Sequence, residues 1–485
     1  MVSKDIIPLR EISGFDLETD VLVAGFGGAG ASAALEARCA GADVIVLERS
    51  SGGGGSTQMS ACEMYLGGSG GTRLQQDLGI EDSTENFYKY MKACFGDNCD
   101  EERLKLFCEG AAAHFDWAES LGVPYNRGFF DGRDVVAMTG DSLQYTGNER
   151  AWPFNQQSTP VPRGHLPADS DHGGGLVFMG ALMKRVEESG ARILCDSKIT
   201  ALIQDENGAI CGVSAKIDNQ QKMIKARRGV ILCTGGFVMN EAMTRKYLPD
   251  IDPIATRHGN PGDMGDGIRL GQAAGGNTLN MNEAFVGIAH YPPAQLTYGI
   301  FVNDQGQRFL NEDVYLARLG HYATQQSGGR VYMFIDNKYF DRPAYLQVEI
   351  VSVGETVEEV EREAGLPEGA LQQTVEYYNK HAAKGEDPLF HKVSEWLAPL
   401  QEAPFALVSY ALDQIKPPVF TLGGLEVKPT GEVLTPQGHS IPGLYAAGRA
   451  VAGIPRTSAG YASGMSVADV TFFGRLAGIS AAAQG

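Results

Sequence analysis

Three glycines and one acidic residue near the start of the chain have the types and spacing of a dinucleotide-binding site. Gly25, Gly27 and Gly30 form the pattern G-x-G-x-x-G. In such a turn the first glycine permits a tight bend, the second lets the backbone approach a pyrophosphate, and the third lets a helix pack closely on a strand. Glu48 lies where an acidic side chain accepts hydrogen bonds from ribose hydroxyls. These residues predict a site for the pyrophosphate and ribose of a dinucleotide.

The segments around this turn predict the elements that must position it. Residues 21–24 are an apolar run typical of a buried parallel strand, residues 29–40 predict a helix of small residues, and residues 44–47 predict a second strand. The N-terminus of such a helix offers free N–H groups and a positive dipole end to phosphates. A glycine-rich turn without a ligand is the alternative, and the position of Glu48 disfavours it.

The composition of the 485-residue chain restricts its class and its partners. A net charge of −19 argues against nucleic acid or an anionic membrane as a partner. No apolar run reaches membrane-spanning length and residues 1–20 lack the apolar core of a signal peptide, so we expect a cytoplasmic protein without an integral membrane segment. The eight cysteines include no C-x-x-C pair, so neither a metal ion nor an iron–sulfur cluster is expected.

Changes in glycine content predict how the chain is divided into domains. Strands that end in glycine turns recur through residues 1–283, become rare in residues 284–418, and return in residues 419–485. The middle segment carries more aromatic residues and hairpin-like strands. We therefore expect one nucleotide-binding domain built from both ends of the chain, with residues 284–418 inserted as a second domain.

Five separated segments resemble, in the same order, the fumarate reductase and 3-ketosteroid dehydrogenase superfamily of flavoproteins. They are the glycine turn with Glu48, TGGF at 234–237, GDG at 265–267, FVNDQGQRFLNED at 301–313, and IPGLYAAG at 441–448 with the helix after it. The resemblance implies an α/β fold, in which a Rossmann-like FAD-binding domain carries an inserted α+β cap domain over the isoalloxazine face. It also implies FAD as the cofactor, and the absence of an attachment motif predicts that FAD is bound non-covalently.

The resemblance also implies which residues contact FAD. Ser56 and Thr57 lie in the glycine-rich loop after Glu48, which is expected to wrap a planar ligand, and Ser466 is interpreted as a small residue that lets the last helix approach FAD. The predicted contacts are Gly25, Gly27, Gly28, Ala29, Gly30, Glu48, Arg49, Ser56, Thr57, Ile199, Thr234, Gly235, Gly236, Asp266, Gly448, Arg449, Ser466 and Val467.

Within the superfamily, the chain is most similar to the 3-ketosteroid Δ4-(5α)-dehydrogenases. The similarity is carried by TLGGL at 421–425, GYASG at 460–464, PRGH at 162–165 and Tyr315 in NEDVY. It implies Tyr315, Tyr461 and Ser463 as the catalytic residues. The implied reaction interconverts a 3-keto-5α-steroid and its Δ4 enone, with hydride transfer between C5 and flavin N5 and proton exchange at C4.

These side chains suit the chemistry of a ketone. A ketone acidifies its α C–H bond, and a donor is needed at the ketone oxygen, where enolate charge develops. Tyr461 fits that task, the Gly464 N–H is a second donor, Ser463 would exchange the α proton and Tyr315 would relay it. A free tyrosine has a pKa of about 10, so Tyr315 must be coupled to a relay or held near positive charge to act as a base near neutrality.

A reductase of an unsaturated carboxylate, similar to a fumarate reductase, is the alternative. In this case His290 and Arg456 would hold the substrate. A fumarate reductase needs a cluster of cations, but Phe420 occupies the place of its histidine and Arg318 is displaced from the place of its acid arginine. A third interpretation, a flavin-bound electron-transfer subunit, is disfavoured because iron–sulfur and haem motifs are absent.

Aromatic residues of the cap predict the character of the substrate site. Phe285, Tyr291 and Tyr298 are expected to make it largely apolar, and Phe420 is assigned to it as well. The expected partners are therefore a hydrophobic small molecule of the steroid class and an electron donor or acceptor. Physiological direction does not follow from the sequence, because the electron partner decides it.

Overall fold

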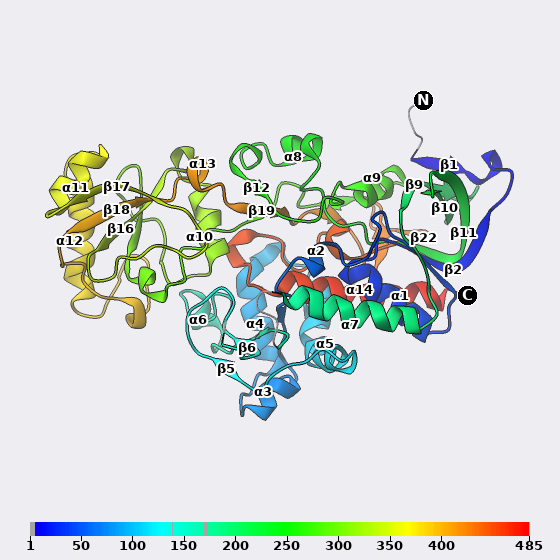
Figure 1. Cartoon of the computed structure of the whole chain (residues 1–485), viewed down its shortest axis with the longest axis horizontal. Coiled ribbons are helices and arrows are strands. Elements are labelled where there is room, and N and C mark those ends of the chain that lie inside the picture. Colours follow the sequence, from blue (N-terminus) through cyan, green and yellow to red (C-terminus); the bar gives the residue numbers. More distant parts are fainter. Residues whose placement is uncertain (1–4, 138, 169–172, 485) are drawn as a thin grey trace.

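The computed structural model describes residues 5–137, 139–168 and 173–484. The molecule is elongated, as Figure 1 shows, with a large sheet and its helices at one end and a smaller sheet with two helices at the other. A mainly helical part, formed within residues 64–165 and called the helical part below, lies below the middle of the molecule in this view. No helix in the described part of the chain is both long enough and apolar enough to cross a membrane.

The large sheet contains a parallel core that carries the glycine turn. Its parallel strands run in the order β22 (Ser440–Ala446), β11 (Gln220–Leu232), β2 (Leu17–Ala24), β3 (Val44–Leu47) and β8 (Arg192–Leu194). The ends of the middle strands that lead to the turn, residues 21–24, 44–47 and 229–232, are buried apolar runs, as expected for a sheet covered on both faces. The sheet is completed by β9 (Ser197–Gln204), β10 (Ile210–Ile217), β1 (Ile6–Pro8) and β21 (Glu432–Leu434).

Both ends of the chain contribute to this part of the molecule. Helix α1 (Gly28–Cys39) follows the glycine turn, and α14 (Met465–Ala483) packs against it. The contact is made by small residues, among them Ala29 opposite Gly474. Helix α7 (Gly174–Glu188) packs on α1 as well, as Figure 1 shows. The α/β fold class with a Rossmann-like FAD-binding fold is therefore confirmed.

The inserted part of the chain forms the opposite end of the molecule. Its sheet has the order β15 (Ile300–Asn303), β16 (Val331–Asp336), β18 (Phe405–Ser409) and β17 (Glu349–Gly354). The associated helices are α10 (Leu316–Ala323), α11 (Val357–Ala364), α12 (Ala370–Ala382) and α13 (Leu412–Ile415). This mixture of strands and helices has the composition expected of an α+β cap, and the limits 284 and 418 stay a prediction.

Two short strands at the junction position the aromatic residues of the site. Strand β14 (Ala284–Val286) enters the cap and β19 (Pro418–Thr421) leaves it, and the two pair in antiparallel fashion. Phe285 and Phe420 are directly opposite each other in this register. Because cross-strand partners share one face of a sheet, the pairing fixes these two rings together. Strand β12 (Thr256–Arg257) pairs with the other edge of β19.

The helical part contains more structure than its loop-rich sequence indicated. Apolar residues at helical spacing in 84–95 and 101–121 predict two helices, and the structure has them as α4 (Thr84–Phe95) and α5 (Glu101–Ser120). Each begins after a side-chain cap, Ser83 and Asp100. The loop-rich sequence of residues 122–175 predicts loops, yet these residues contribute three strands to a four-stranded sheet. That sheet has the order β4 (Met64–Tyr65), β7 (Gly164–His165), β6 (Leu143–Gln144) and β5 (Phe129–Phe130).

The remaining short elements connect these parts. They are α2 (Gly55–Gln58), α3 (Arg73–Asp77), α6 (Phe154–Gln157), α8 (Glu241–Tyr247), α9 (Asp266–Ala273), β13 (Thr278–Leu279) and β20 (Gly424–Leu425).

Candidate active site

A single cavity of about 620 Å³ runs from the glycine turn to the junction with the cap. All the residues predicted to contact FAD line it except Gly30. Tyr315, Tyr461, Ser463 and Gly464 line it too, together with the ring pair formed by Phe285 and Phe420. The structure thus brings the predicted nucleotide site and the predicted reaction site into one continuous space.

The glycine turn has the geometry that a bound pyrophosphate requires. Gly25 has a φ of +106°, and a side chain there would collide with the Cys233 carbonyl; a side chain at Gly30 would collide with the Gly25 carbonyl. The protein's own packing therefore explains these two glycines. A Cβ at Gly27 would meet only ordinary contacts, the nearest 3.6 Å away at Gly55 Cα. Gly27 instead leaves its side of the turn open toward the cavity, so the turn fits a phosphate group.

The Glu48 carboxylate is held in place by backbone N–H groups on both of its oxygens. Oε2 accepts a hydrogen bond from Phe26 N and Oε1 accepts one from Ser50 N, each at 2.8 Å. A carboxylate oxygen can accept two hydrogen bonds, so each oxygen has capacity left for a ribose hydroxyl. This arrangement fits the adenosine half of FAD.

The charged residues around Asp266 were only partly anticipated. Asp266 begins α9 and forms ion pairs with Lys198 at 2.9 Å and with Arg49 at 3.8 Å. Lys198 lines the cavity beside the predicted Ile199. The sequence signal for Lys198 was weak, because a lysine in an alternating strand is usually a solvated side chain.

The aromatic end of the cavity consists of four rings in contact. Phe285 and Phe420 stack with ring centroids 4.5 Å apart and planes 5° from parallel. The Tyr461 ring meets Phe285 edge-on at 4.9 Å, and Tyr315 lies 6.5 Å from Tyr461 at an angle of 27°. These contacts form an apolar wall on which only the two tyrosines carry polar groups.

The Tyr461 hydroxyl is the end of a hydrogen-bond chain. It lies 2.7 Å from Ser466 Oγ, and the Arg449 guanidinium donates to that same oxygen. With its oxygen already accepting from Arg449, Ser466 can donate to Tyr461 and leave the Tyr461 proton free for a ligand. Burial raises the pKa of Tyr461, while the Arg449 charge lowers it. Tyr461 is therefore placed to act as a neutral donor.

Ser463 and Tyr315 are fixed by residues of the helical part. Ser463 N donates to Thr146 O at 2.9 Å, and Thr146 Oγ1 donates back to Ser463 O at 3.1 Å. Tyr315 N donates to Asn148 Oδ1 at 2.8 Å. Burial raises the pKa of Tyr315 well above its usual value, and a hydrogen bond with Ser463 lowers it only in part.

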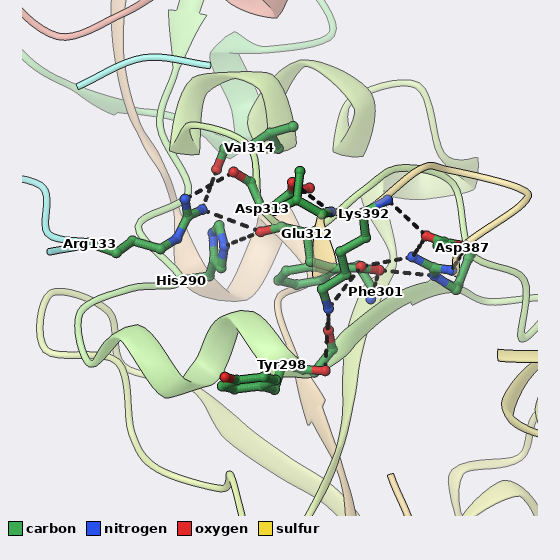
Figure 2. Close-up of polar contacts among 12 residues, drawn as sticks. Arg133, His290, Tyr298, Phe301, Glu312, Asp313, Val314, Asp387 and Lys392 are labelled. Carbon is green, nitrogen blue, oxygen red and sulfur yellow. Dashed lines mark hydrogen bonds and ion pairs between the residues drawn. The ribbon is translucent and has the colours of Figure 1, made fainter. Parts of the chain in front are cut away.

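Arg133 holds the backbone segment that leads into Tyr315. Its guanidinium donates to the carbonyl oxygens of Val314 at 2.7 Å and Asp313 at 2.9 Å, as Figure 2 shows. The same guanidinium lies 4.0 Å from the centre of the Tyr291 ring. A residue outside the inserted segment thus contacts the cap next to the predicted relay residue.

Two residues predicted to bind substrate, His290 and Tyr291, are not among the described residues that line the cavity. His290 Nε2 lies 3.1 Å from the Glu312 carbonyl, and its ring is directed toward the cap backbone in Figure 2. Burial and the nearby Arg133 charge lower the pKa of His290 to about 3, so the ring is neutral. A neutral histidine turned toward a carbonyl oxygen does not supply the cation that a carboxylate substrate needs.

Arg456 and Tyr298 likewise have other partners and are not among the described residues around the cavity. Arg456 donates to Asn98 O at 3.1 Å and forms an ion pair with Asp100 at 3.7 Å. Tyr298 stacks on Tyr339 at 4.2 Å. Their positions give no support to a role in binding substrate.

Several lining residues were missed by the sequence reasoning. They are Glu63, Lys198, Val135, Val136, Asp263, Tyr345 and Leu346. Glu63 lies in the glycine-rich loop after Glu48 that was expected to wrap a ligand. A carboxylate in such a loop is the sequence signal that could have identified Glu63 as a lining residue. Val135, Val136, Tyr345 and Leu346 come from segments without a recognisable pattern.

The sequence matches the family described as FAD binding domain over residues 20–464. This match covers nearly the whole chain and all the described lining residues except Ser466, Val467 and Val470. Because the glycine turn, Glu48 and the cavity fit the nucleotide, FAD is the cofactor.

Two relatives illustrate the range of activities in this family. The NADH:fumarate oxidoreductase of Klebsiella pneumoniae is 29% identical over 488 residues, and the match covers 96% of this chain and 47% of that protein. The chain thus spans about half the length of this relative. The 3-oxo-5-alpha-steroid 4-dehydrogenase of Comamonas testosteroni is 27% identical, with 89% of this chain and 92% of that protein covered.

The solved structures include one very similar chain. The 3-ketosteroid-Δ4-(5α)-dehydrogenase from Rhodococcus jostii RHA1, in complex with 4-androstene-3,17-dione, has a TM-score of 0.92 and 40% sequence identity, and covers 98% of this chain and 99% of that chain. The open conformation of a flavocytochrome c3 fumarate reductase has a TM-score of 0.67 and 26% identity, with 97% and 79% covered. The chain is therefore a member of the family of FAD-dependent oxidoreductases that contains both fumarate reductases and 3-ketosteroid dehydrogenases.

Proposed function

We propose that this protein interconverts 3-keto-5α-steroids and Δ4-3-ketosteroids. The observation that carries the proposal is the apolar wall of the cavity, where stacked Phe285 and Phe420 lie beside the hydroxyl of Tyr461. A fused hydrocarbon ring system with one ketone matches this surface: the rings supply apolar area and the ketone needs one donor. Burial of apolar area at about 25 cal/mol per Å² would supply most of the affinity.

FAD, when bound, supplies a two-electron acceptor for the hydride that leaves the β carbon of the ketone, or a donor in the reverse direction. The glycine turn and Glu48 would hold its pyrophosphate and ribose, and Arg449, Ser466 and Val467 line the cavity toward the reaction end. The remaining tasks fall to side chains of the protein.

The three assigned side chains divide these tasks by position. Tyr461 donates to the ketone oxygen and stabilises the enolate charge that develops there. Ser463 exchanges the α proton, and Tyr315 lies next to it as the polar group contributed by the cap. Gly464 is the N-cap residue of α14, and first-turn N–H groups lack partners within their helix, so it can add a second donor.

A dicarboxylate substrate has less support in this cavity. Arg449 is a lining cation, but its guanidinium lies 4.9 Å from the Phe420 ring and donates to Ser466. His290 and Arg456 are directed elsewhere. Two carboxylates would therefore lose much of their hydration against aromatic rings without paired cations, which is unfavourable.

Product identification tests the proposal. The FAD-loaded enzyme is incubated with 5α-androstane-3,17-dione and an artificial electron acceptor, and the mixture is analysed for 4-androstene-3,17-dione. We expect the enone to accumulate in proportion to enzyme. A holoenzyme that leaves the steroid unchanged in this direction, and does not reduce the enone when supplied with an electron donor, would refute the proposal.

A further inference from the structure

Proton transfer in this site lacks an evident base among the residues assigned so far. A serine hydroxyl is neutral near neutral pH and would have to lose its own proton when it takes one from carbon. Tyr315 is a poor acceptor for that proton, because burial raises its pKa well above the usual value. The described residues therefore need another acceptor within reach of Ser463.

Glu63 lies in the required place. It is 3% exposed, lines the same cavity as Ser463 and Tyr315, and precedes strand β4. That segment packs tightly against the loop of Ser463: Tyr65 N donates to Gly464 O at 3.2 Å. Gly464 has a φ of +85°, and a side chain there would come within 3.0 Å of the Glu63 backbone. The chain thus forces the two segments to adjoin.

The hydrogen bonds around Glu63 leave one of its oxygens available. Gln144 Nε2 donates to Glu63 Oε1 at 2.8 Å, and Ala137 N donates to the amide oxygen of Gln144, which fixes the direction of that amide. Glu63 Oε2 is buried and has no hydrogen-bond partner among the described residues. Because buried polar atoms are nearly always paired, an unpaired carboxyl oxygen in a reaction cavity indicates a group that binds a proton or a ligand.

We infer that Glu63 accepts the proton that Ser463 passes on, so that Ser463 and Glu63 act as a pair. The inference rests on the proposed ketone chemistry. As the α C–H bond breaks, Ser463 Oγ takes that proton while its own O–H bond breaks and a new O–H bond forms at Glu63 Oε2. The electron pair of the C–H bond moves toward the ketone oxygen, where Tyr461 donates. In the reverse direction the carboxylic acid returns its proton through Ser463 to the α carbon.

The charge state of Glu63 suits both directions. Burial, together with the nearby charge of Glu149, raises the pKa of Glu63 to about 8, while the nearby Ser463 and Thr146 hydroxyls and the Gln144 amide lower it. Dehydrogenation needs the ionised carboxylate, so its rate should fall as the pH decreases below about 8. Reduction of the enone needs the protonated acid, so its rate should fall as the pH increases above about 8. A group with a pKa near the working pH is the effective choice for general acid–base catalysis.

Glu149 provides a matched control. It is also buried, but it accepts hydrogen bonds from Tyr65 OH at 2.8 Å and from Gly147 N at 2.9 Å, and it is not one of the described lining residues. Both oxygens of Glu149 thus have protein partners. A role in structure alone would make its substitution at least as costly as that of Glu63.

The test compares the FAD-loaded wild type with Glu63→Gln, Glu63→Asp and Glu149→Gln, after FAD content and thermal unfolding confirm that each is folded. Turnover of 5α-androstane-3,17-dione is measured against pH. Infrared difference spectra follow the carbonyl band of a buried carboxylic acid between about pH 6 and 10, because strongly perturbed carboxyl groups titrate in this range. The infrared measurement needs no substrate.

We expect Glu63→Gln to lower kcat by about 10²–10⁴ and to remove both the acid limb of the pH profile and the titrating band. Glu63→Asp should keep a titrating band and recover part of the rate. Glu149→Gln should keep the acid limb and the titrating band, both moved to lower pH, because the charge of Glu149 helps to raise the pKa of Glu63. Wild-type turnover and pH profile in Glu63→Gln would overturn the inference and leave the proposed function intact. An inactive wild type would instead refute the proposed function and, with it, this role of Glu63.

Discussion

The Tyr461 hydroxyl lies 2.7 Å from the Ser466 hydroxyl, which also accepts a hydrogen bond from Arg449. Tyr461 belongs to the loop before α14 and Ser466 to the first turn of that helix. Ser466, expected only to make room for FAD, thus orients the proposed ketone donor. Ser466 thus connects the aromatic end of the cavity to the partly buried Arg449 guanidinium.

Removal of the Tyr461 hydroxyl should slow turnover without disturbing the fold. Tyr461→Phe keeps the ring that contacts Phe285, so FAD content should stay unchanged while kcat falls by about 10²–10³, as for the loss of one oxyanion donor. Ser466→Ala should cost about fivefold, the size of one hydrogen bond. The double variant should be no slower than Tyr461→Phe alone. Steady-state kinetics measure kcat of these variants, with Tyr298→Phe as the control. Full activity in Tyr461→Phe would contradict the role of Tyr461 as the ketone donor.

Ser463 and Tyr315 should act together in one proton path, in which Ser463 exchanges the proton and the Tyr315 hydroxyl orients Ser463 through their hydrogen bond. Ser463→Ala should lower kcat by about 10²–10⁴, and Tyr315→Phe should lower kcat as well because Ser463 is then held less firmly. If both serve one path, the double variant should be hardly slower than the slower single variant. Kinetics of the four enzymes decide this. Losses that multiply in the double variant would show that the two side chains act independently.

Arg133 should matter for the position of Tyr315 and for stability. Arg133→Ala removes donors from the carbonyl groups of Asp313 and Val314, and an unpaired buried polar group costs about 1–3 kcal/mol. We expect a lower unfolding temperature, and a lower kcat because Tyr315 is held less firmly. Arg127→Ala is the matched control, since Arg127 pairs with Asp77 and Glu119 away from the cap. An Arg133→Ala enzyme with normal stability and kcat would rule out this role.

Glu48 should determine how tightly FAD is retained. Glu48→Ala removes the acceptor for ribose and frees the N–H groups of Phe26 and Ser50, and a hydrogen bond to a charged group is worth about 1.5–3 kcal/mol. FAD affinity should therefore fall by about tenfold to a hundredfold. Equilibrium dialysis measures it, with the surface residue Glu18, which pairs with Arg227, changed to Ala as the control. Unchanged affinity in Glu48→Ala would place the ribose elsewhere.

Features with a short-range signature could be predicted from the sequence. The glycine turn, its two strands and Glu48 lie within one βαβ unit, where spacing alone fixes their relation. The strands predicted at 21–24 and 44–47 are present as Leu17–Ala24, which begins four residues earlier, and Val44–Leu47. Apolar residues at helical spacing in 84–95 predict the helix that the structure has at Thr84–Phe95, and the structure adds Ser83 as its cap. Tyr315, Tyr461 and Ser463 were named only through the resemblance, since no spacing connects residues on different parts of the fold.

Features that depend on long-range contacts could not be predicted. The sequence patterns of residues 222–226 and 229–234 predict two strands, but the structure has the single strand β11 (Gln220–Leu232), because β2 pairs along it across a bulge. His290 is directed toward the Glu312 carbonyl and Arg456 toward Asp100, and neither partner is marked in the sequence. The raised pKa of Glu63 depends on its burial, and its fixed oxygen on Gln144, which belongs to residues 122–175, a segment whose sequence predicts loops.

The reaction of the enzyme-bound flavin with a steroid ketone tests the central claim most directly. The oxidised holoenzyme is mixed without oxygen with 5α-androstane-3,17-dione, and the flavin absorbance is followed in a single turnover. We predict that the absorbance is lost and that deuterium at C5 of the steroid slows the loss, because the C5–H bond breaks in that step. An unchanged spectrum with the ketone, together with rapid reoxidation of the reduced enzyme by fumarate, would contradict the account.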